Sequence, residues 1–459
     1  MTRFTLRKTN RLGLFLVLLQ LIPGAFLAAQ NSSDTSHPAK AWSAHFQVTV
    51  IGQSHSGFRS PYRGPNSLAD TVEPVATSVS STLYLGRKLW KGAAIYFNPE
   101  VTGGKGLSFT TGVAGALNGE TYRVGATQPQ VFIARAYFQQ TFALGKQASN
   151  QYLPDEANQV AGRVPARRLT LTIGKFALSD FFDDNAYSRD PRTQFFNWSL
   201  WANGAWDYPA NTRGYTFGLV ADYTVPGWTL RFSSTAVPKI ANYKLMEYQP
   251  AHAHSETLEL EHQYLWNGRP GAFRLNLSRT QSRAPSYQDG LKALRDNDRF
   301  LLLVIAGDTE NIRYGGKKMA IAANMDQQLT RDLGLFSRIG WNDGRYVSWA
   351  FTEIDRTFNL GLSLKGSSWH RPQDVVGLGS VINGISQEHR QFLAAGGDGF
   401  ILGDGALNYA HEFITEWYYS AHLFDHTSLS FDYQFVKNPA YNRDRGPVHV
   451  FGLRFHAEW

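Results

Sequence analysis

One segment of the chain, residues 174–214, concentrates the residues best suited to hold a polyhydroxylated ligand. It carries carboxylates, basic side chains and large aromatic rings, namely Asp180, Asp183, Asp184, Asp190, Asp207, Lys175, Arg189, Arg192, Arg213, Trp198, Trp201, Trp206 and Tyr208. Pyranose rings stack their C–H faces on aromatic rings, and their hydroxyls accept from arginine and donate to carboxylates. The segment therefore suits sugar binding. The alternative is a loop that packs over the rim of a larger structure, with its tryptophans serving only as hydrophobic filling.

Pairs of carboxylates raise a second possibility, the acid and base of a glycosidase. The candidate pairs are Asp183 with Asp184, and Glu259 with Glu261. Adjacent residues of a strand point to opposite faces, however, and pairs two residues apart are ordinary lining of a polar strand face. Neither spacing favours a catalytic pair.

A serine beside histidines is the remaining catalytic candidate. Ser255 follows His252 and His254, and these residue types could form a hydrolase site or, through the two histidines, a metal site. The spacing carries no specific signal for either chemistry. A solvated loop is the simpler interpretation, and we expect no cofactor and no metal.

The elements that must position these residues are strands. Segments with period-2 alternation recur along the chain and are bounded by Gly, Pro, Asn or Asp. Sixteen are predicted, over residues 44–51, 79–85, 93–101, 131–144, 169–175, 215–225, 228–237, 257–265, 273–283, 317–329, 335–342, 356–364, 375–382, 413–423, 429–436 and 448–459. An even number is what an antiparallel transmembrane barrel with both termini on one side requires. We therefore predict an all-β fold, a single antiparallel β-barrel of about sixteen strands over residues 41–459.

The last strand runs off the end of the chain. From Phe451 to Trp459 every second residue is aromatic or aliphatic, and His449 begins the same alternation. The intervening positions are mostly polar. This pattern is typical of the closing strand of an outer-membrane barrel. We expect outer-membrane lipid as a partner, and the barrel-assembly machinery to act through the strand that ends at Trp459.

The beginning of the chain supports export. Four basic residues precede an apolar run over residues 12–19, and Ala28 and Ala29 follow as small residues. Residues 1–29 are therefore predicted to be a cleaved signal peptide. Residues 30–40 are rich in Ser, Asn and Asp and read as a disordered lead-in.

Composition narrows the class further. Removing the signal peptide leaves 45 minus 4 basic residues against 37 acidic ones, so the mature chain is only mildly basic and nucleic acid is not an expected partner. The chain has no Cys, which excludes disulfides and thiolate chemistry. No stretch after residue 29 approaches the roughly 20 apolar residues of a membrane-spanning helix.

The connections between strands alternate between short turns and long segments. Short turns such as residues 226–227 are assigned to the periplasmic side, and long connections such as residues 145–168 and 176–214 are expected to be extracellular or inward-folding. Within the longest, residues 193–202 could form one short amphipathic helix. The polar face of strand 257–265, which carries Glu259 and Glu261, is expected to line a water-filled lumen.

Several motifs resemble one known family. These are residues 61–68 (PYRGPNSL), 86–92 (GRKLWKG), 96–100 (YFNPE), 203–209 (NGAWDYP) and 432–447 (DYQFVKNPAYNRDRGP). In these the chain resembles the carbohydrate-selective porins of the OprB family. The resemblance covers essentially the whole mature chain.

The resemblance implies an outer-membrane porin that passes mono- and oligosaccharides by diffusion through a narrow constriction. By analogy with the family's charged eyelet, the constriction is placed on Glu100, Arg135, Lys175, Asp180, Asp183 and Arg192. Trp198, Trp201 and Trp206 are expected to supply stacking surfaces. The alternatives that remain open are a general or anion-preferring porin, an outer-membrane barrel hydrolase, and a structural or adhesive barrel with a closed lumen.

Overall fold

The computed structural model describes residues 39–121, 127–145 and 150–459. The predicted signal peptide, residues 1–29, lies outside the described residues, as does all but the end of the predicted lead-in, residues 30–40.

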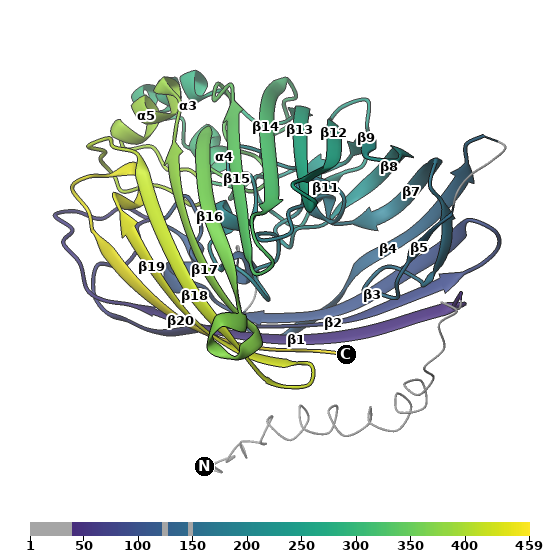
Figure 1. Ribbon diagram of the computed structural model, residues 1–459. Helices are drawn as coiled ribbons and strands as arrows, with labels where there is room; N and C mark the ends of the chain where they lie inside the picture. The colour runs from purple at the N-terminus through teal and green to yellow at the C-terminus, as the bar shows by residue number, and fades with distance from the viewer. Residues whose placement is uncertain (1–38, 122–126, 146–149) are drawn as a thin grey trace, which may run out of the picture. The chain divides into compact units, whose positions relative to one another are not determined.

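Sixteen antiparallel strands close into one barrel, in the order β1-β2-β3-β4-β7-β8-β9-β12-β13-β14-β15-β16-β17-β18-β19-β20 (Figure 1). Their bounds are β1 Trp42–His55, β2 Glu73–Lys88, β3 Ala93–Gly104, β4 Gln130–Ala143, β7 Arg168–Phe176, β8 Thr216–Val225, β9 Trp228–Thr235, β12 His254–Trp266, β13 Arg269–Ser282, β14 Gly316–Gln328, β15 Leu333–Asn342, β16 Arg356–Gly366, β17 Arg371–Gly384, β18 Glu412–Phe424, β19 Thr427–Lys437 and β20 Val448–Glu458. Each contains or largely overlaps one predicted segment. The prediction of a sixteen-stranded barrel is confirmed.

The last strand closes the barrel against the first. β20 pairs with β1 from Val450, opposite His55, to Glu458, opposite Gln47. The backbone of Trp459 then exchanges hydrogen bonds with Phe46, and the two rings stack at 5.8 Å between centroids. Closure leaves no unpaired sheet edge, which is the condition for strands to cross a lipid bilayer.

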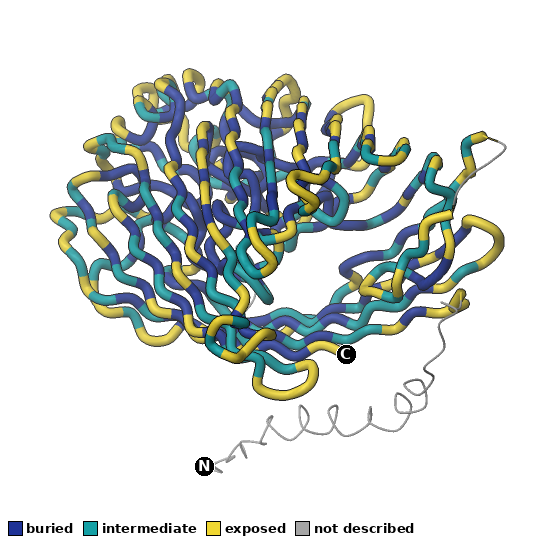
Figure 2. The backbone as a smooth tube through the Cα atoms, in the orientation of Figure 1, coloured by how far each residue is buried: buried dark blue, intermediate teal, exposed yellow. Residues whose placement is uncertain are grey.

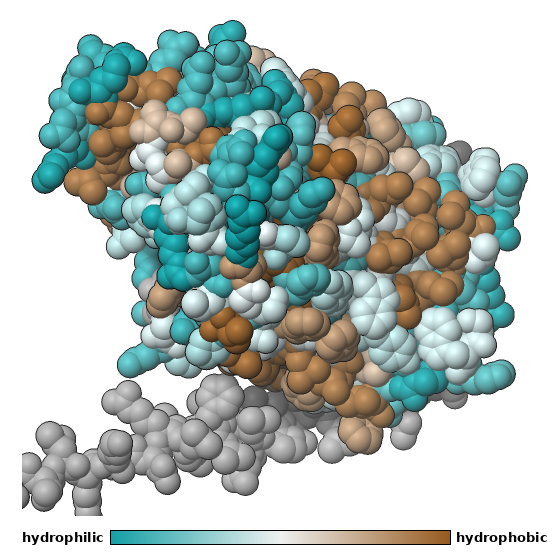
Figure 3. Space-filling model, turned by 90° about the vertical axis from the view of Figure 1, so that its left-hand side faces the viewer, coloured by the Kyte–Doolittle hydropathy of each residue, from teal (hydrophilic) through white to brown (hydrophobic). Residues whose placement is uncertain are grey.

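Side chains alternate between the outside and the inside of the barrel, as the period-2 pattern predicts. On β12, Leu258 and Leu260 are 40% and 41% exposed, whereas Thr257 and Glu259 are 1% exposed. Buried and exposed residues alternate along most of the strands in the same way (Figure 2). Apolar side chains gather over part of the outer surface and are bordered by hydrophilic ones (Figure 3). The exposed leucines therefore face where lipid would be.

The two ends of the barrel differ in their connections. One end holds the turns 226–227, 267–268, 329–332, 367–370 and 425–426, together with the first residue of β1 and the last of β20. The other holds the connections 56–72, 105–129, 177–215, 236–253, 283–315, 343–355, 385–411 and 438–447. Short turns mark the periplasmic end of such barrels and long loops the extracellular end.

One long connection breaks this alternation. Residues 144–167 leave β4 at the short-turn end and contain a hairpin of β5 (Asn150–Leu153) and β6 (Gly162–Pro165). The hairpin folds into the barrel, since Ser43 and Asn98, which face inward, hydrogen-bond to Glu156 and Asn158. The sequence predicted an extracellular or inward-folding connection here, because short and long connections were expected to alternate. The connection does fold inward, but it starts from the short-turn end of the barrel.

Shorter elements lie in the connections. The helices are α2 Trp198–Trp201, α3 Tyr287–Asp296, α4 Arg299–Ile305 and α5 Gln387–Ala394, the 3-10 turns are Leu107–Thr110, Gly119–Thr121, Leu178–Asp180, Ser367–Trp369 and Pro439–Tyr441, and β10 Val237–Pro238 pairs with β11 Met246–Glu247. Among the described residues, no helix is long and apolar enough to span a membrane. The helix suggested for residues 193–202 is only the single turn α2, because Asn197 caps its first turn. Before the cap, the backbone groups of Gln194, Phe196 and Asn197 bond to the barrel wall instead.

The extracellular loops fold into the barrel and form its main apolar core. We call residues 177–215 the inward loop. Its Phe182, Trp198 and Trp206 pack in one cluster with Phe392 and Tyr441 from other loops. The loops therefore fill much of the lumen, and the expectation of a water-lined face on β12 is wrong at Glu259, which lies inside but is covered and accepts from the backbone N–H of Asp183.

Buried charges on the barrel wall hold the inward loop. The guanidinium of Arg338 on β15 donates to both carboxylate oxygens of Asp183 at 3.1 Å and to the carbonyls of Ser188 and Leu200. The carboxylate of Glu416 on β18 accepts from the backbone N–H groups of Phe196 and Asn197 at 2.5 and 2.9 Å. Buried polar groups in such places are costly unless every one is paired, so these contacts fix one conformation of the loop.

Arg454 on β20 adds a third anchor. Its guanidinium donates to the carbonyls of Pro191 and Gln194 at 2.8 and 2.6 Å. These three buried anchors therefore lie on β15, β18 and β20, on one side of the barrel.

The substitution Arg338→Met tests this anchoring. It keeps side-chain bulk but leaves the buried Asp183 carboxylate without its guanidinium, so the free energy of unfolding should fall by about 3–5 kcal/mol. Urea unfolding of the refolded protein in lipid vesicles, followed by tryptophan fluorescence, measures it. The matched control is Arg279→Met, because Arg279 pairs with Glu256 in the open at 3.6 Å and should cost less than about 1 kcal/mol. Equal losses in the two variants would contradict the anchoring role.

Candidate functional site

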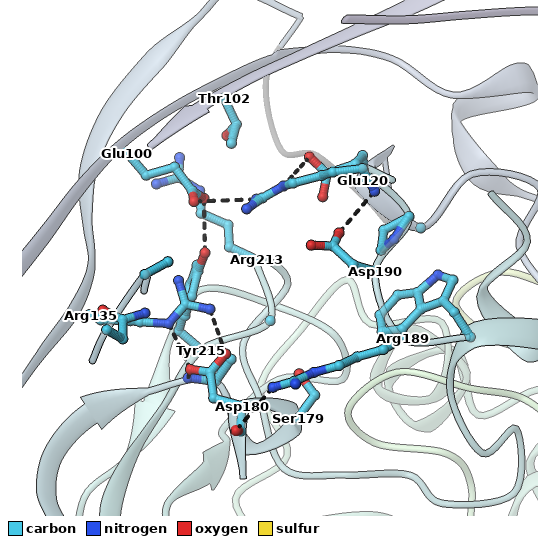
Figure 4. Close-up of a pocket in the computed structure, with 18 of the residues that line it drawn as sticks. Glu100, Thr102, Glu120, Arg135, Ser179, Asp180, Arg189, Asp190, Arg213 and Tyr215 are labelled. Carbon is cyan, nitrogen blue, oxygen red and sulfur yellow. Dashed lines mark hydrogen bonds and ion pairs between the residues drawn. The ribbon is translucent and has the colours of Figure 1, made fainter. Parts of the chain in front are cut away.

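A cavity of about 420 Å³ lies between the inward loop and the wall formed by β2, β3 and β4. Its walls come from five parts of the chain: these strands, the inward loop, the second inward loop (residues 105–129, described except for 122–126), the hairpin, and Phe351 of the connection 343–355. We call it the pore cavity. Charged side chains point into it from opposite sides (Figure 4).

A guanidinium and a carboxylate join the strand wall to the inward loop. Arg135 of β4 donates from Nε and Nη2 to the two oxygens of Asp180, both at 2.6 Å. Such a forked pair fixes the orientation of both groups. The Arg135 side chain is 10% exposed and that of Asp180 is 25% exposed, so the pair is partly open to the cavity.

Glu100 of β3 is the centre of a second network. Its carboxylate accepts from the hydroxyls of Thr82 at 2.7 Å and Tyr215 at 2.9 Å. Arg192 of the inward loop approaches the same carboxylate at 3.4 Å. Burial raises the pKa of Tyr215 well above its ordinary value, with the Glu100 charge adding to the effect. Tyr215 therefore stays a neutral donor.

Arg192 also joins the second inward loop. Its Nε lies 3.1 Å from Glu120, and its Nη1 donates to the hydroxyl of Tyr84 at 3.0 Å. Burial disfavours the charge of Arg192, but Glu120, Tyr84 and Glu100 outweigh that and raise its pKa well above the ordinary value. Arg192 thus remains a cation at every physiological pH.

Aromatic rings form another part of the cavity lining. The rings of Tyr208 and Phe351 stack at 4.7 Å and 16°, and Trp198 lies parallel to Phe351 at 6.5 Å and 9°. Trp201 meets Trp198 edge-on at 6.2 Å. All four residues line the cavity, which therefore has aromatic surface near its charged networks.

A buried carboxylate holds this aromatic surface in place. Asp207 accepts from the backbone N–H groups of Trp349, Ala350 and Phe351 at 2.7, 3.1 and 2.7 Å. These bonds tie residues 349–351 of the β15–β16 connection to the inward loop. The aromatic surface is thus set by tertiary contacts, because Phe351 and Tyr208 are far apart in sequence.

The hairpin bounds the cavity from the periplasmic side. Glu156, Ala157 and Asn158 at its tip belong to the lining. Asn98 donates to Asn158 at 2.8 Å, and the Lys88 ammonium donates to the carbonyl of Ala161 at 2.6 Å. The hairpin is therefore pinned to the inner face of β2 and β3.

The charges of the cavity lining nearly balance. Among the described residues the lining holds four arginines and five carboxylates, namely Arg135, Arg189, Arg192, Arg213, Glu100, Glu120, Glu156, Asp180 and Asp190. Arg213 stacks its guanidinium 4.0 Å from the centroid of Phe132. A field of mixed sign does not concentrate one charge type, so the lining suits neutral polar solutes.

The structure brings six of the nine residues proposed from the sequence to this cavity. Glu100, Arg135, Asp180, Arg192, Trp198 and Trp201 all line it. Three lie elsewhere. Lys175 donates to the carbonyl of Ile133 at 2.7 Å, Asp183 is the partner of Arg338, and Trp206 packs 6.0 Å from the ring of Phe182 in the loop core.

Sequence reasoning missed several lining residues. Tyr84 shares the inward face of β2 with Ser80 and Thr82, so the period-2 pattern could have found it. Glu120, Glu156 and Phe351 stand in connections without periodicity. No local signal marks them, because they reach the cavity only through the folding of separate loops.

The serine and histidine candidates do not form a catalytic pair in this geometry. The Ser255 hydroxyl lies 2.8 Å from that of Thr280, and Nδ1 of His254 lies 2.7 Å from the carbonyl of Pro250. His252 packs against the ring of Tyr314. Within residues 39–121, 127–145 and 150–459, no three His, Asp or Glu side chains gather as metal ligands would.

Comparison with known proteins identifies relatives of the whole fold. The family model described as "Carbohydrate-selective porin, OprB family" matches residues 69–459. No curated protein sequence matches significantly. The high-pH structure of Pseudomonas putida OprB is similar with a TM-score of 0.66 and 16% identity, covering 91% of this chain and 94% of that one. The outer membrane channel DcaP of Acinetobacter baumannii aligns over 91% and 97% of the chains with 10% identity and a TM-score of 0.48.

The Arg135–Asp180 pair generates a prediction about ion selectivity. Arg135→Gln should shift the permeability ratio of K⁺ to Cl⁻ upward about twofold or more, and Asp180→Asn should shift it downward, because each leaves one unbalanced charge in the lining. The double variant should return near the wild-type ratio. Reversal potentials across a planar bilayer under a KCl gradient measure this. If neither single variant moved the reversal potential, the ion path would not pass this pair.

Proposed function

The chain belongs to the OprB family of carbohydrate-selective porins, and from this premise we propose that sugars cross the barrel through the pore cavity. The protein is a porin of the outer membrane, with a closed sixteen-stranded barrel. It serves the passive, sugar-preferring diffusion of carbohydrates. The proposal concerns the path and the residues that contact the sugar.

The observation that carries the proposal is the pairing of stacked rings with paired charges in one cavity. Trp201, half-buried and backed by the buried rings of Trp198, Tyr208 and Phe351, offers aromatic surface. Arg135 and Arg192 offer guanidinium donors opposite carboxylate acceptors. A pyranose has both an apolar C–H face and a rim of hydroxyls, and it needs both kinds of partner. Binding must also be weak enough for release, which solvent-shared contacts at a narrow passage provide.

A general or anion-preferring porin is the second candidate for the same cavity. An anion preference would be favoured by a lining dominated by basic residues, and four arginines facing five carboxylates do not give that excess. Nothing in the lining therefore favours an anion over a neutral solute. A general porin would pass ions without saturable binding of sugar, and the experiment below distinguishes it.

The family and the fold are those of a channel. We further propose that the protein has no hydrolytic activity of its own. The partner of the Ser255 hydroxyl is Thr280, which supports this reading over a serine hydrolase. Assays of the refolded protein with ester and glycoside substrates test it, and any turnover abolished by Ser255→Ala would contradict it.

The periplasmic end carries aromatic residues where a membrane interface would lie. Trp42, Trp90, Trp228, Trp266 and Trp459 are all exposed there. Exposed indoles at strand ends suit the lipid headgroup region, so outer-membrane lipid is proposed as a partner. The strand that ends at Trp459 is proposed as the signal for barrel assembly, and membrane insertion of a chain lacking Trp459 tests this.

We also propose that one barrel domain, residues 41–459, follows a cleaved peptide and a short lead-in.

Trp201→Ala tests the proposed sugar path. Trp201 is half-buried at the cavity, so its loss should remove stacking surface and raise the sugar concentration that half-blocks the ion current by about threefold to tenfold. Maltotriose titration of single-channel current measures this. The control is Trp417→Ala, because Trp417 is 38% exposed on the outer face of β18 and should leave the block unchanged. Equal behaviour of the two variants would rule out Trp201 as a sugar contact.

A further inference from the structure

A groove on the outside of the barrel has a different chemistry from the pore. It lies at the extracellular ends of β17, β18 and β19 and continues onto the connection 438–447, with a volume of about 770 Å³. The strand residues that line the groove have side chains on the outer face of the barrel, so the groove does not open into the lumen. Its lining combines apolar side chains with basic ones.

The lower part of the groove is apolar and follows the strand register. Ile382 of β17 is the neighbour of Phe413 on β18, and Phe413 is in turn the neighbour of Lys437 on β19. Phe435 lies two residues before Lys437 on the same face. Ile382 is 44% exposed, within the range of the other apolar side chains on the outer face of the barrel. This surface continues the belt that faces lipid.

The upper part of the groove is basic. Lys437 is the last residue of β19, His411 directly precedes β18, and Arg443 stands in the connection 438–447; all three are exposed. Arg443 donates to the carbonyl of Tyr409 at 3.2 Å, which directs the side chain along the groove. None of the three has a carboxylate within ion-pair distance among the described residues.

The carboxylate next to Arg443, that of Asp444, already has other partners. Asp444 accepts from Asn408 and from Tyr62, both at 2.9 Å. These hydrogen bonds, with Arg59 and Arg443 nearby, lower the pKa of Asp444. Its charge therefore offsets part of the positive field, and Lys437 on the far side of the groove is left to attract an anion.

We propose that this groove binds a phosphorylated glycolipid of the outer leaflet. Lys437 and Arg443 hold the headgroup phosphate, since ammonium and guanidinium groups are the usual hydrogen-bond donors to phosphate oxygens. The acyl chains lie on Ile382, Phe413 and Phe435. Basic pockets directly beside a lipid-facing surface are recognised sites for anionic lipid headgroups. The groove lies at the long-loop end, which is the end that meets the outer leaflet.

The test uses the full mature protein, refolded in detergent, with diphosphoryl lipid A as the probe. Native mass spectrometry of the titration gives the apparent dissociation constant. The double variant Lys437→Gln with Arg443→Gln should weaken binding at least about tenfold. The reason is that Lys and Arg near an anionic headgroup make similar favourable contributions to the binding free energy, and the variant removes both. The matched control removes two exposed charges of another extracellular loop, Lys292→Gln with Arg299→Gln, and should bind as wild type. Equal affinity of the two double variants would overturn the proposal.

Two further arms identify the source of the phosphate and guard against misfolding. Ile382→Gln should weaken lipid A binding, and millimolar inorganic phosphate should not displace the lipid. Displacement by free phosphate, with Ile382→Gln unaffected, would make this a site for a soluble anion and overturn the lipid assignment. If the double variant fails to fold, judged by heat-dependent gel mobility, Lys437→Gln is compared with Lys437→Arg. Only the arginine variant should retain the affinity, and loss in both or in neither would contradict the proposal.

Discussion

The structure depends on buried acidic and basic side chains of the barrel wall that bind the backbone of the loops inside it. Glu412 on β18 accepts from the N–H groups of Ala114, Gly115 and Ala440, and Glu416 accepts from two N–H groups of the inward loop. A folded loop in the lumen has no strand partner for its backbone, and unpaired buried N–H groups cost about 1–3 kcal/mol each. The wall carboxylates supply the missing acceptors.

This arrangement divides the barrel into two functional halves. The side from β14 to β20 carries the inner anchors Arg338, Glu412, Glu416 and Arg454, all at most 1% exposed, and serves as a support. The opposite side, with Glu100 and Arg135, keeps the pore cavity. The deepest anchors of the loops therefore lie apart from the cavity, whereas Arg135, Asp180 and Arg192 both line the cavity and join the loops to the wall or to each other. Asp183 illustrates the division, since it lies in the inward loop but serves as an anchor.

The sequence was sufficient for the barrel and insufficient for the loops. Every barrel strand could be predicted because lipid and lumen impose opposite polarity on alternate residues, as Leu258 and Glu259 show. Loops obey no such period. The residue types of the segment 174–214 indicated a sugar site, but only tertiary contacts distinguish Trp201 at the cavity from Trp206 in the core. The position of Glu156 at the cavity could not be predicted either, because it too depends on tertiary contacts.

The most direct test of the account is single-channel recording of the refolded mature protein in a planar bilayer, titrated with glucose and with a malto-oligosaccharide. An open channel is expected whose current falls saturably as sugar is added, because sugar would occupy the cavity that ions use. A steady current that sugar does not alter would contradict binding in the cavity and indicate a general porin. Absence of current would contradict the open path itself.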